Sequence, residues 1–159
     1  MNDRSHRRKL GQNYLIDPVI LFEIERAINP QMQDTFFEIG PGTGALTKSL
    51  IGEEIKIIAM DLDEDNIKSL QKKFSHANHE FIHGDILHAP LDFLSKQIHR
   101  VVGNLPYNIS TQIILKLIHF TPYIADISSH TVSFPLYPYG AYPSVTIVLN
   151  GFGKAVYSL

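Results

Sequence analysis

The sequence contains no cysteine. A chain without cysteine can form neither a disulfide nor a thiolate metal site, which favours a reducing compartment such as the cytoplasm. No run of apolar residues reaches the roughly 18 that a membrane-spanning helix needs. The polar, basic N-terminus also lacks the apolar segment of a secretion signal. We therefore expect a cytoplasmic protein that does not engage a membrane.

Charge is nearly absent from the last part of the chain. Of 159 residues, 44% are hydrophobic and 19% are charged, which suits one domain with a hydrophobic core. Lys154 is the only Lys, Arg, Asp or Glu after residue 127. We interpret residues 1–127 as the domain and residues 128–159 as an anomalous tail. A basic cluster at residues 4–9 is either a contact for phosphates or a solvated terminus.

Strand and helix patterns alternate along the first 127 residues. Short apolar runs predict strands at residues 35–39, 56–60, 80–83 and 99–102. Helical periodicity predicts helices at residues 19–28, 45–50, 64–74 and 111–120, the last one capped by Ser110. This alternation predicts an α/β fold with a doubly wound, Rossmann-like parallel sheet. Residues 145–149 of the tail could form another strand, because β-branched residues dominate them.

A glycine-rich turn follows the first predicted strand. Gly40, Gly42 and Gly44 stand between that strand and a helix, where glycine permits close approach of a ligand to the backbone. Asp61 ends the next strand, about 20 residues on, where nucleotide-binding sheets place a carboxylate on ribose hydroxyls. These residues predict a nucleoside site. The alternatives are a purely structural turn and an Asp61 that caps the following helix.

Two further features narrow the choice of ligand. The spacing Gly-x-Gly-x-Gly, rather than the Gly-x-Gly-x-x-Gly of dinucleotide binders, favours S-adenosylmethionine over a nicotinamide cofactor. Asp85 ends the third strand, where its carboxylate is placed to accept a hydrogen bond from an adenine amino group. A turn residue is the commoner use of aspartate at such a position.

The segment Asn104-Leu105-Pro106-Tyr107 follows the fourth strand. An exocyclic amine on a base is a poor nucleophile, because its lone pair is delocalised into the ring. The Asn104 side-chain oxygen and the Leu105 carbonyl could bind both amine hydrogens and free that lone pair. Pro106 fixes the turn without a competing N–H, and Tyr107 offers a face for an unstacked base. In-line methyl transfer would then need no metal; the alternative is a proline loop with a core tyrosine.

Three segments together resemble the ribosomal small-subunit RNA adenine dimethyltransferases: residues 11–15, 37–47 and 104–111. The resemblance implies S-adenosylmethionine as donor and two adjacent adenines near the 3′ end of small-subunit rRNA as substrate. It implies the small ribosomal subunit as partner, and we expect a monomer. The residues that it implies for the donor or transfer site are Gln12, Asn13, Leu15, Gly40, Asp61, Asp85 and Asn104, with Tyr107 on the target adenine.

Two departures from that family's pattern bear on function. Asp61 stands where the family usually has Glu, so the ribose contact would be longer or mediated by water. After Ile127 the family's further strands and its helical RNA-binding domain have no counterpart in this sequence, which a frameshifted or truncated reading frame would explain. Other hypotheses are an RNA-binding or ribosome-assembly factor, a large-subunit rRNA adenine methyltransferase, and an unstable pseudogene product with an exposed sheet edge.

Overall fold

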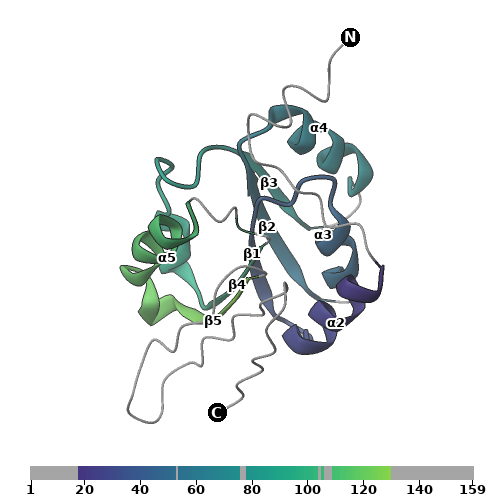
Figure 1. The fold of residues 1–159 in the computed structure, drawn as a ribbon, viewed down its shortest axis with the longest axis horizontal. Helices are drawn as coiled ribbons and strands as arrows, with labels where there is room; N and C mark the ends of the chain where they lie inside the picture. Colours follow the sequence, from purple (N-terminus) through teal and green to yellow (C-terminus); the bar gives the residue numbers. More distant parts are fainter. Residues whose placement is uncertain (1–17, 53, 76–77, 104, 106–108, 130–159) are drawn as a thin grey trace.

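The computed structural model describes residues 18–52, 54–75, 78–103, 105 and 109–129. These residues form one parallel sheet of five strands: β1 (Thr35–Ile39), β2 (Lys56–Asp61), β3 (Glu80–His83), β4 (His99–Gly103) and β5 (Ile124–Ser129). The helices are α2 (Pro18–Ile28), α3 (Ala45–Leu50), α4 (Glu64–Lys73) and α5 (Ser110–Ile118), with 3-10 turns η1 (Asp92–Lys96) and η2 (Thr121–Tyr123). Figure 1 shows α5 on one face of the sheet and α2, α3 and α4 on the other. The predicted Rossmann-like α/β class is confirmed.

The order of the strands indicates which edge of the sheet would bind a ligand. The order in the sheet is β3-β2-β1-β4-β5, and every pairing is parallel. From β1 the chain therefore builds outward through β2 and β3, then returns to the other side of β1 with β4. Open sheets of this kind bind ligands beyond the carboxyl ends of the strands, at the point where the order reverses. That point lies between the ends of β1 and β4, where Ile39 is paired with Gly103.

Helices cover both faces of the sheet, so its central strands are apolar on both sides. Phe37 and Ile39 pack on the α5 side with Leu94, while Phe36 and Ile57 pack on the side of α2 and α3. Parallel strands buried on two faces appear in a sequence as continuous apolar runs. This is why the four predicted strands were found, with β2 and β4 each one residue longer than predicted.

The strand β5 was missed, and the reason is local. Ile124 pairs with His99 and Asp126 pairs with Arg100, so a bulge interrupts the ladder. The bulge breaks the alternation of a regular strand, and the two core residues, Ile124 and Ile127, stand three apart. β5 also crosses the boundary predicted at residue 127.

The predicted cap of α5 was wrong. Ser110 is the first residue of the helix, and the N-cap position belongs to Ile109, which provides no side-chain cap. The helix therefore begins one residue earlier than the pattern indicated. The basic cluster at residues 4–9 and the strand predicted at 145–149 lie outside the described residues.

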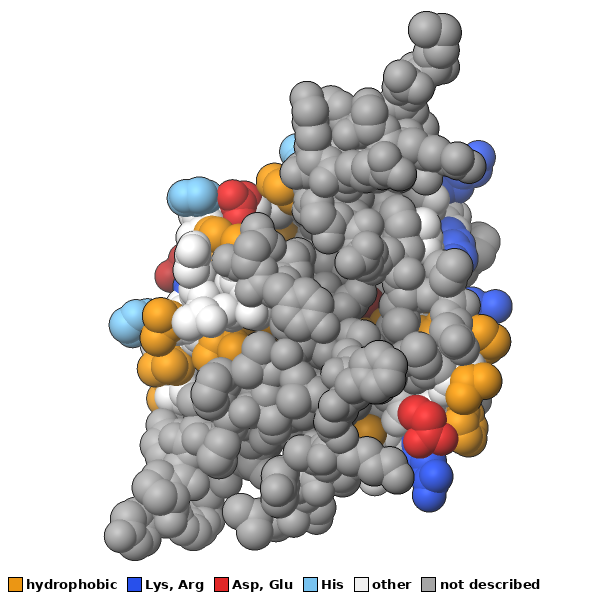
Figure 2. Space-filling view, in the orientation of Figure 1, with side chains coloured by type: hydrophobic (Ala, Val, Ile, Leu, Met, Phe, Trp, Pro, Cys, Tyr) orange, Lys and Arg blue, Asp and Glu red, His pale blue; other side chains and the backbone are white. Residues whose placement is uncertain are grey.

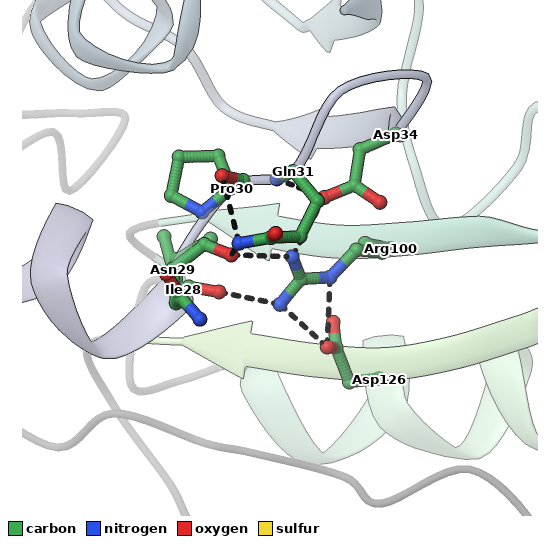
Figure 3. Close-up of polar contacts among 7 residues, drawn as sticks. All are labelled: Ile28, Asn29, Pro30, Gln31, Asp34, Arg100 and Asp126. Carbon is green, nitrogen blue, oxygen red and sulfur yellow. Dashed lines mark hydrogen bonds and ion pairs between the residues drawn. The ribbon is translucent and has the colours of Figure 1, made fainter.

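Arg100 joins four segments at the amino edge of the sheet (Figure 3). Its guanidinium Nη1 lies 2.8 Å from Asp34 Oδ2, and its Nε donates to Asp126 Oδ2 at 2.8 Å. Nη2 donates to the carbonyl of Ile28 at 2.6 Å, and Nη1 donates to that of Asn29 at 3.4 Å. A single side chain thus fixes the end of α2 and the loop before β1 against β4 and β5.

Apolar side chains are exposed along two helices at the margins of the molecule (Figure 2): Val19 and Phe22 of α2, and Leu115 and Ile118 of α5. Exposed apolar residues are common on folded proteins, so we assign these no function. Among the described residues, no helix is long and apolar enough to cross a membrane.

Candidate active site

The glycine turn has the backbone geometry that its sequence predicts. Gly40, Gly42 and Gly44 all have positive φ, at 68°, 55° and 81°. A Cβ at Gly44 would clash with Leu70 Cδ2 on α4, so packing as well as the positive φ disfavours a side chain there. A Cβ at Gly40 would meet nothing within 4 Å. The turn is therefore packed at its helix end and open at Gly40, where a ligand can approach the backbone.

Asp61 lies against this turn. Its Oδ2 accepts hydrogen bonds from the Gly42 N–H at 2.9 Å and from Asn66 Nδ2 at 3.2 Å, and its Oδ1 accepts from the Asp63 N–H at 2.8 Å. The N-cap of α4 is Asp63, whose side chain accepts from the Asp65 N–H. The alternative that Asp61 caps this helix is therefore wrong, and Asp61 instead ties the end of β2 to the glycine turn.

A second carboxyl group is buried beneath the turn. Glu38 is 1% exposed and its Oε2 accepts a hydrogen bond from Thr47 Oγ1 at 2.6 Å. Burial, together with the nearby Asp61 carboxylate, raises the pKa of Glu38 to about 7, although the Thr47 hydrogen bond acts in the opposite direction. The charge of this group therefore changes near neutral pH.

Asp85 lies beside Asp61 at the same edge, because the Gly84 N–H donates to the Asp61 carbonyl at 2.9 Å. The Asp85 carboxylate accepts from the Leu87 N–H at 2.9 Å and contacts His88 Nδ1 at 2.7 Å. The His88 contact, then the Leu87 hydrogen bond, lower the pKa of Asp85. Asp85 is therefore an ionised acceptor at neutral pH, and it also stabilises its own turn.

The end of β4 approaches β1 closely. A Cβ at Gly103 would lie 2.5 Å from the carbonyl oxygen of Ile39, so glycine is required where the two strands meet. Leu105 follows and is 3% exposed, packed in the core on the α5 side. This side chain anchors the segment at the point where the strand order reverses.

The structure thus brings several predicted residues to one edge: Gly40, Gly42, Gly44, Asp61, Asp85 and Leu105. The other predicted residues, Gln12, Asn13, Leu15, Asn104, Pro106 and Tyr107, lie outside the described part of the chain. Sequence reasoning missed Glu38 and its partner Thr47. The available signal was an acidic residue inside an otherwise apolar strand, since such a residue is buried only with a partner.

Comparison with known proteins decides the family. The chain matches the ribosomal RNA adenine dimethylase family over residues 3–137. It belongs to this family. The match includes every residue predicted for the donor and transfer sites.

Curated relatives of the chain are longer than the chain itself. The ribosomal RNA small subunit methyltransferase A of Nitrosospira multiformis is 39% identical over 120 residues, which cover 76% of this chain and 46% of the relative. The protein of the same name from Thiobacillus denitrificans is 42% identical over 120 residues. The chain spans about half the length of the curated relatives that it matches.

One solved structure provides a close comparison of the fold within this family. A dimethyladenosine transferase from Plasmodium falciparum superposes with a TM-score of 0.62 at 31% identity, over 70% of this chain and 40% of that one.

Proposed function

We propose that this chain binds S-adenosylmethionine at the carboxyl edge of its sheet and transfers methyl groups to the N6 amine of adenines in small-subunit rRNA. The observation that carries the donor site is the Asp61 carboxylate, held beside the glycine turn by the Gly42 N–H. A glycine turn after one strand and a carboxylate at the end of the next form the usual nucleoside cradle of open parallel sheets.

In this proposal Asp61 binds the ribose hydroxyls of the donor. A carboxylate offers about four acceptor positions, and three N–H groups of the protein already bind to this one. The ribose would use the remaining position or a bridging water molecule. Asp85 would accept from the adenine amino group with its free lone pairs. Gln12, Asn13 and Leu15 would complete the donor's surroundings.

The transfer step follows from the chemistry of the amine. Asn104 and the Leu105 carbonyl would accept the two amine hydrogens and localise the nitrogen lone pair, which then attacks the sulfonium methyl carbon. The carbon–sulfur bond breaks, its electron pair stays on sulfur, and the methylated amine releases its extra proton to water. Tyr107 would stack on the extruded adenine, and Pro106 would fix the segment. The buried Leu105 side chain supports this arrangement, because it anchors the backbone that supplies the acceptor.

The small ribosomal subunit is the partner that the relatives favour. The relatives named for the small subunit share 39% and 42% identity with this chain. The solved 23S rRNA methyltransferase ErmE shares 29% identity over 70% of the chain, with a TM-score of 0.60. We propose two adjacent adenines near the 3′ end of the small-subunit rRNA as the target.

The test is methyl transfer from labelled S-adenosylmethionine to small and large ribosomal subunits that lack adenine dimethylation. We expect N6-methylated adenine in the small-subunit rRNA, detected by mass spectrometry of its nucleosides, and none with an Asn104→Ala variant. Methyl transfer to the large subunit alone would contradict the proposal that small-subunit rRNA is the substrate. Donor binding without transfer to either subunit would favour a non-enzymatic factor.

We also propose that residues 128–159 arise from a shifted reading frame, because their composition departs so sharply from that of residues 1–127. The nucleotide sequence tests this directly. Another frame that continues the family pattern would support the proposal, and an intact frame with a stable protein would contradict it.

A further inference from the structure

A buried carboxamide contacts the Asp61 carboxylate. Asn66 is the third residue of α4, is 9% exposed, and forms the buried side of this helix with Ile67 and Leu70. Its Nδ2 donates to Asp61 Oδ2 at 3.2 Å. Burying a polar side chain costs free energy that burying an apolar one does not, so the packing of α4 alone does not explain an asparagine at this position. The hydrogen bond to Asp61 gives the polar group a use.

Asn66 differs from the other groups that hold this carboxylate. The Gly42 N–H donates to the same oxygen at 2.9 Å from the glycine turn, and the Asp63 N–H donates to Oδ1 at 2.8 Å. Both of these donors are backbone groups, whereas Asn66 contributes a side chain from a helix. The turn and α4 therefore hold Oδ2 together, and the contribution of α4 can be removed by substitution.

The length of the Asp61 side chain makes its orientation important. Asp61 stands where the family usually has Glu, and aspartate has one rotatable bond fewer with which to reach a ribose. Three N–H groups of the protein leave about one of the four acceptor positions that a carboxylate offers. Any rotation of the carboxylate would therefore move the acceptor that the ribose needs. A carboxamide is also uncharged, so it orients the carboxylate without placing a cation at the donor site.

We propose that Asn66 is a positioning residue that orients Asp61 toward the ribose of the bound nucleoside. This inference rests on the proposed donor site. Asn66 acts through Asp61 and touches no part of the donor itself. Its loss should therefore weaken the hydrogen bond between Asp61 and a ribose hydroxyl, and leave the contacts of the adenine and amino-acid groups unchanged.

The experiment is calorimetric titration of the full chain at pH 8 with S-adenosylhomocysteine, which has the same adenosine group as the donor, and with its 2′-deoxy and 3′-deoxy derivatives. The test variant is Asn66→Leu, which keeps the approximate size of the side chain and removes the N–H donor. The matched control is Gln71→Leu. Gln71 also lies on α4, and its carboxamide donates to the Phe81 carbonyl at 3.3 Å instead of to Asp61.

We expect Asn66→Leu to bind S-adenosylhomocysteine about tenfold more weakly than the wild type does, which is the size of one hydrogen bond to a charged group. With at least one deoxy derivative, the loss caused by this substitution should fall to about twofold or less, because the hydroxyl that Asp61 binds is already missing. The Gln71→Leu variant should bind all three ligands as the wild type does.

An equal loss with all three ligands would show a general structural role for Asn66 and overturn the inference, as would an unchanged affinity for S-adenosylhomocysteine. A wild type that binds none of the ligands would overturn the proposed function and this inference with it. Should Asn66→Leu not fold, Asn66→Asp keeps the shape of the side chain and places a second carboxylate beside Asp61. We expect this variant to show the same dependence on the ribose hydroxyls, and a loss equal for all three ligands would again contradict the role of Asn66.

Discussion

The two edges of this sheet hold their carboxyl groups in opposite ways. At the amino edge, Arg100 neutralises Asp34 and Asp126 with distances of 2.7–2.8 Å. At the carboxyl edge, Glu38 and Asp61 are buried beside the glycine turn and are held by neutral donors, a hydroxyl, an amide and backbone N–H groups. The first edge satisfies its charges internally and stabilises the fold. The second holds its carboxyl groups with neutral donors among the described residues, and it is the edge where we propose the donor site.

The largest effect should come from Arg100→Ala, which leaves Asp34 and Asp126 without their cation. Removing one partner of a buried ion pair typically costs about 3–5 kcal/mol. Because Asp34 and Asp126 are partly buried, we expect a loss at the lower end of that range in the free energy of unfolding measured with urea. Donor affinity of the folded fraction should not change, because the cluster lies at the opposite edge. The control is Arg26→Ala, since Arg26 is exposed on α2. Equal stability of the two variants would contradict the structural role of Arg100.

Glu38 should make the protein less stable as the pH rises, whereas a carboxylate paired with a cation makes a protein more stable as the pH rises. Its pKa is raised from 4.5 to about 7 in the folded state, so the folded protein binds more protons than the unfolded chain between these values. The free energy of unfolding contributed by Glu38 therefore falls as pH rises from about 4.5 to about 7, by up to about 3 kcal/mol, and is constant above. Urea unfolding of wild type and Glu38→Gln across this range checks the prediction. Parallel curves for the two proteins would show that Glu38 ionises normally.

Gly44→Ala should damage the ligand edge through packing. The new methyl group would meet Leu70 at a backbone φ of 81°, and overpacking with positive φ costs about 1–3 kcal/mol. We expect lower stability and weaker donor binding together, measured by thermal unfolding and calorimetry. Gly52→Ala is the control, because its nearest neighbour is the end of the flexible Ile55 side chain at 3.2 Å. If the Gly44→Ala variant bound the donor with unchanged affinity, the glycine turn would not be part of the donor site.

The contrast between the edges also explains what the sequence could predict. The glycine turn and Asp61 were found because a strand, a turn and a following strand fix their spacing locally. The cluster of Arg100 with Asp34 and Asp126 could not be predicted, because these two partners are 66 and 26 residues away from Arg100 in the sequence. β5 was missed for a different and local reason, because the bulge between its pairings at Ile124 and Asp126 breaks the alternation of a regular strand. The Glu38–Thr47 contact depends on how α3 packs over β1, which no local pattern records.

The central claim is that the carboxyl edge binds the methyl donor through Asp61. Calorimetric titration with S-adenosylmethionine at pH 8 tests it most directly, on the wild type, on Asp61→Ala and on Asp65→Ala as the matched control. Asp65 is exposed on the next helix, and its backbone N–H, which donates to Asp63, is kept in the alanine variant. We expect saturable binding in the wild type and in Asp65→Ala, and at least a tenfold loss in Asp61→Ala, which corresponds to about 1.4 kcal/mol. Equal binding by all three proteins, or binding by none of them while folded, would contradict the donor site.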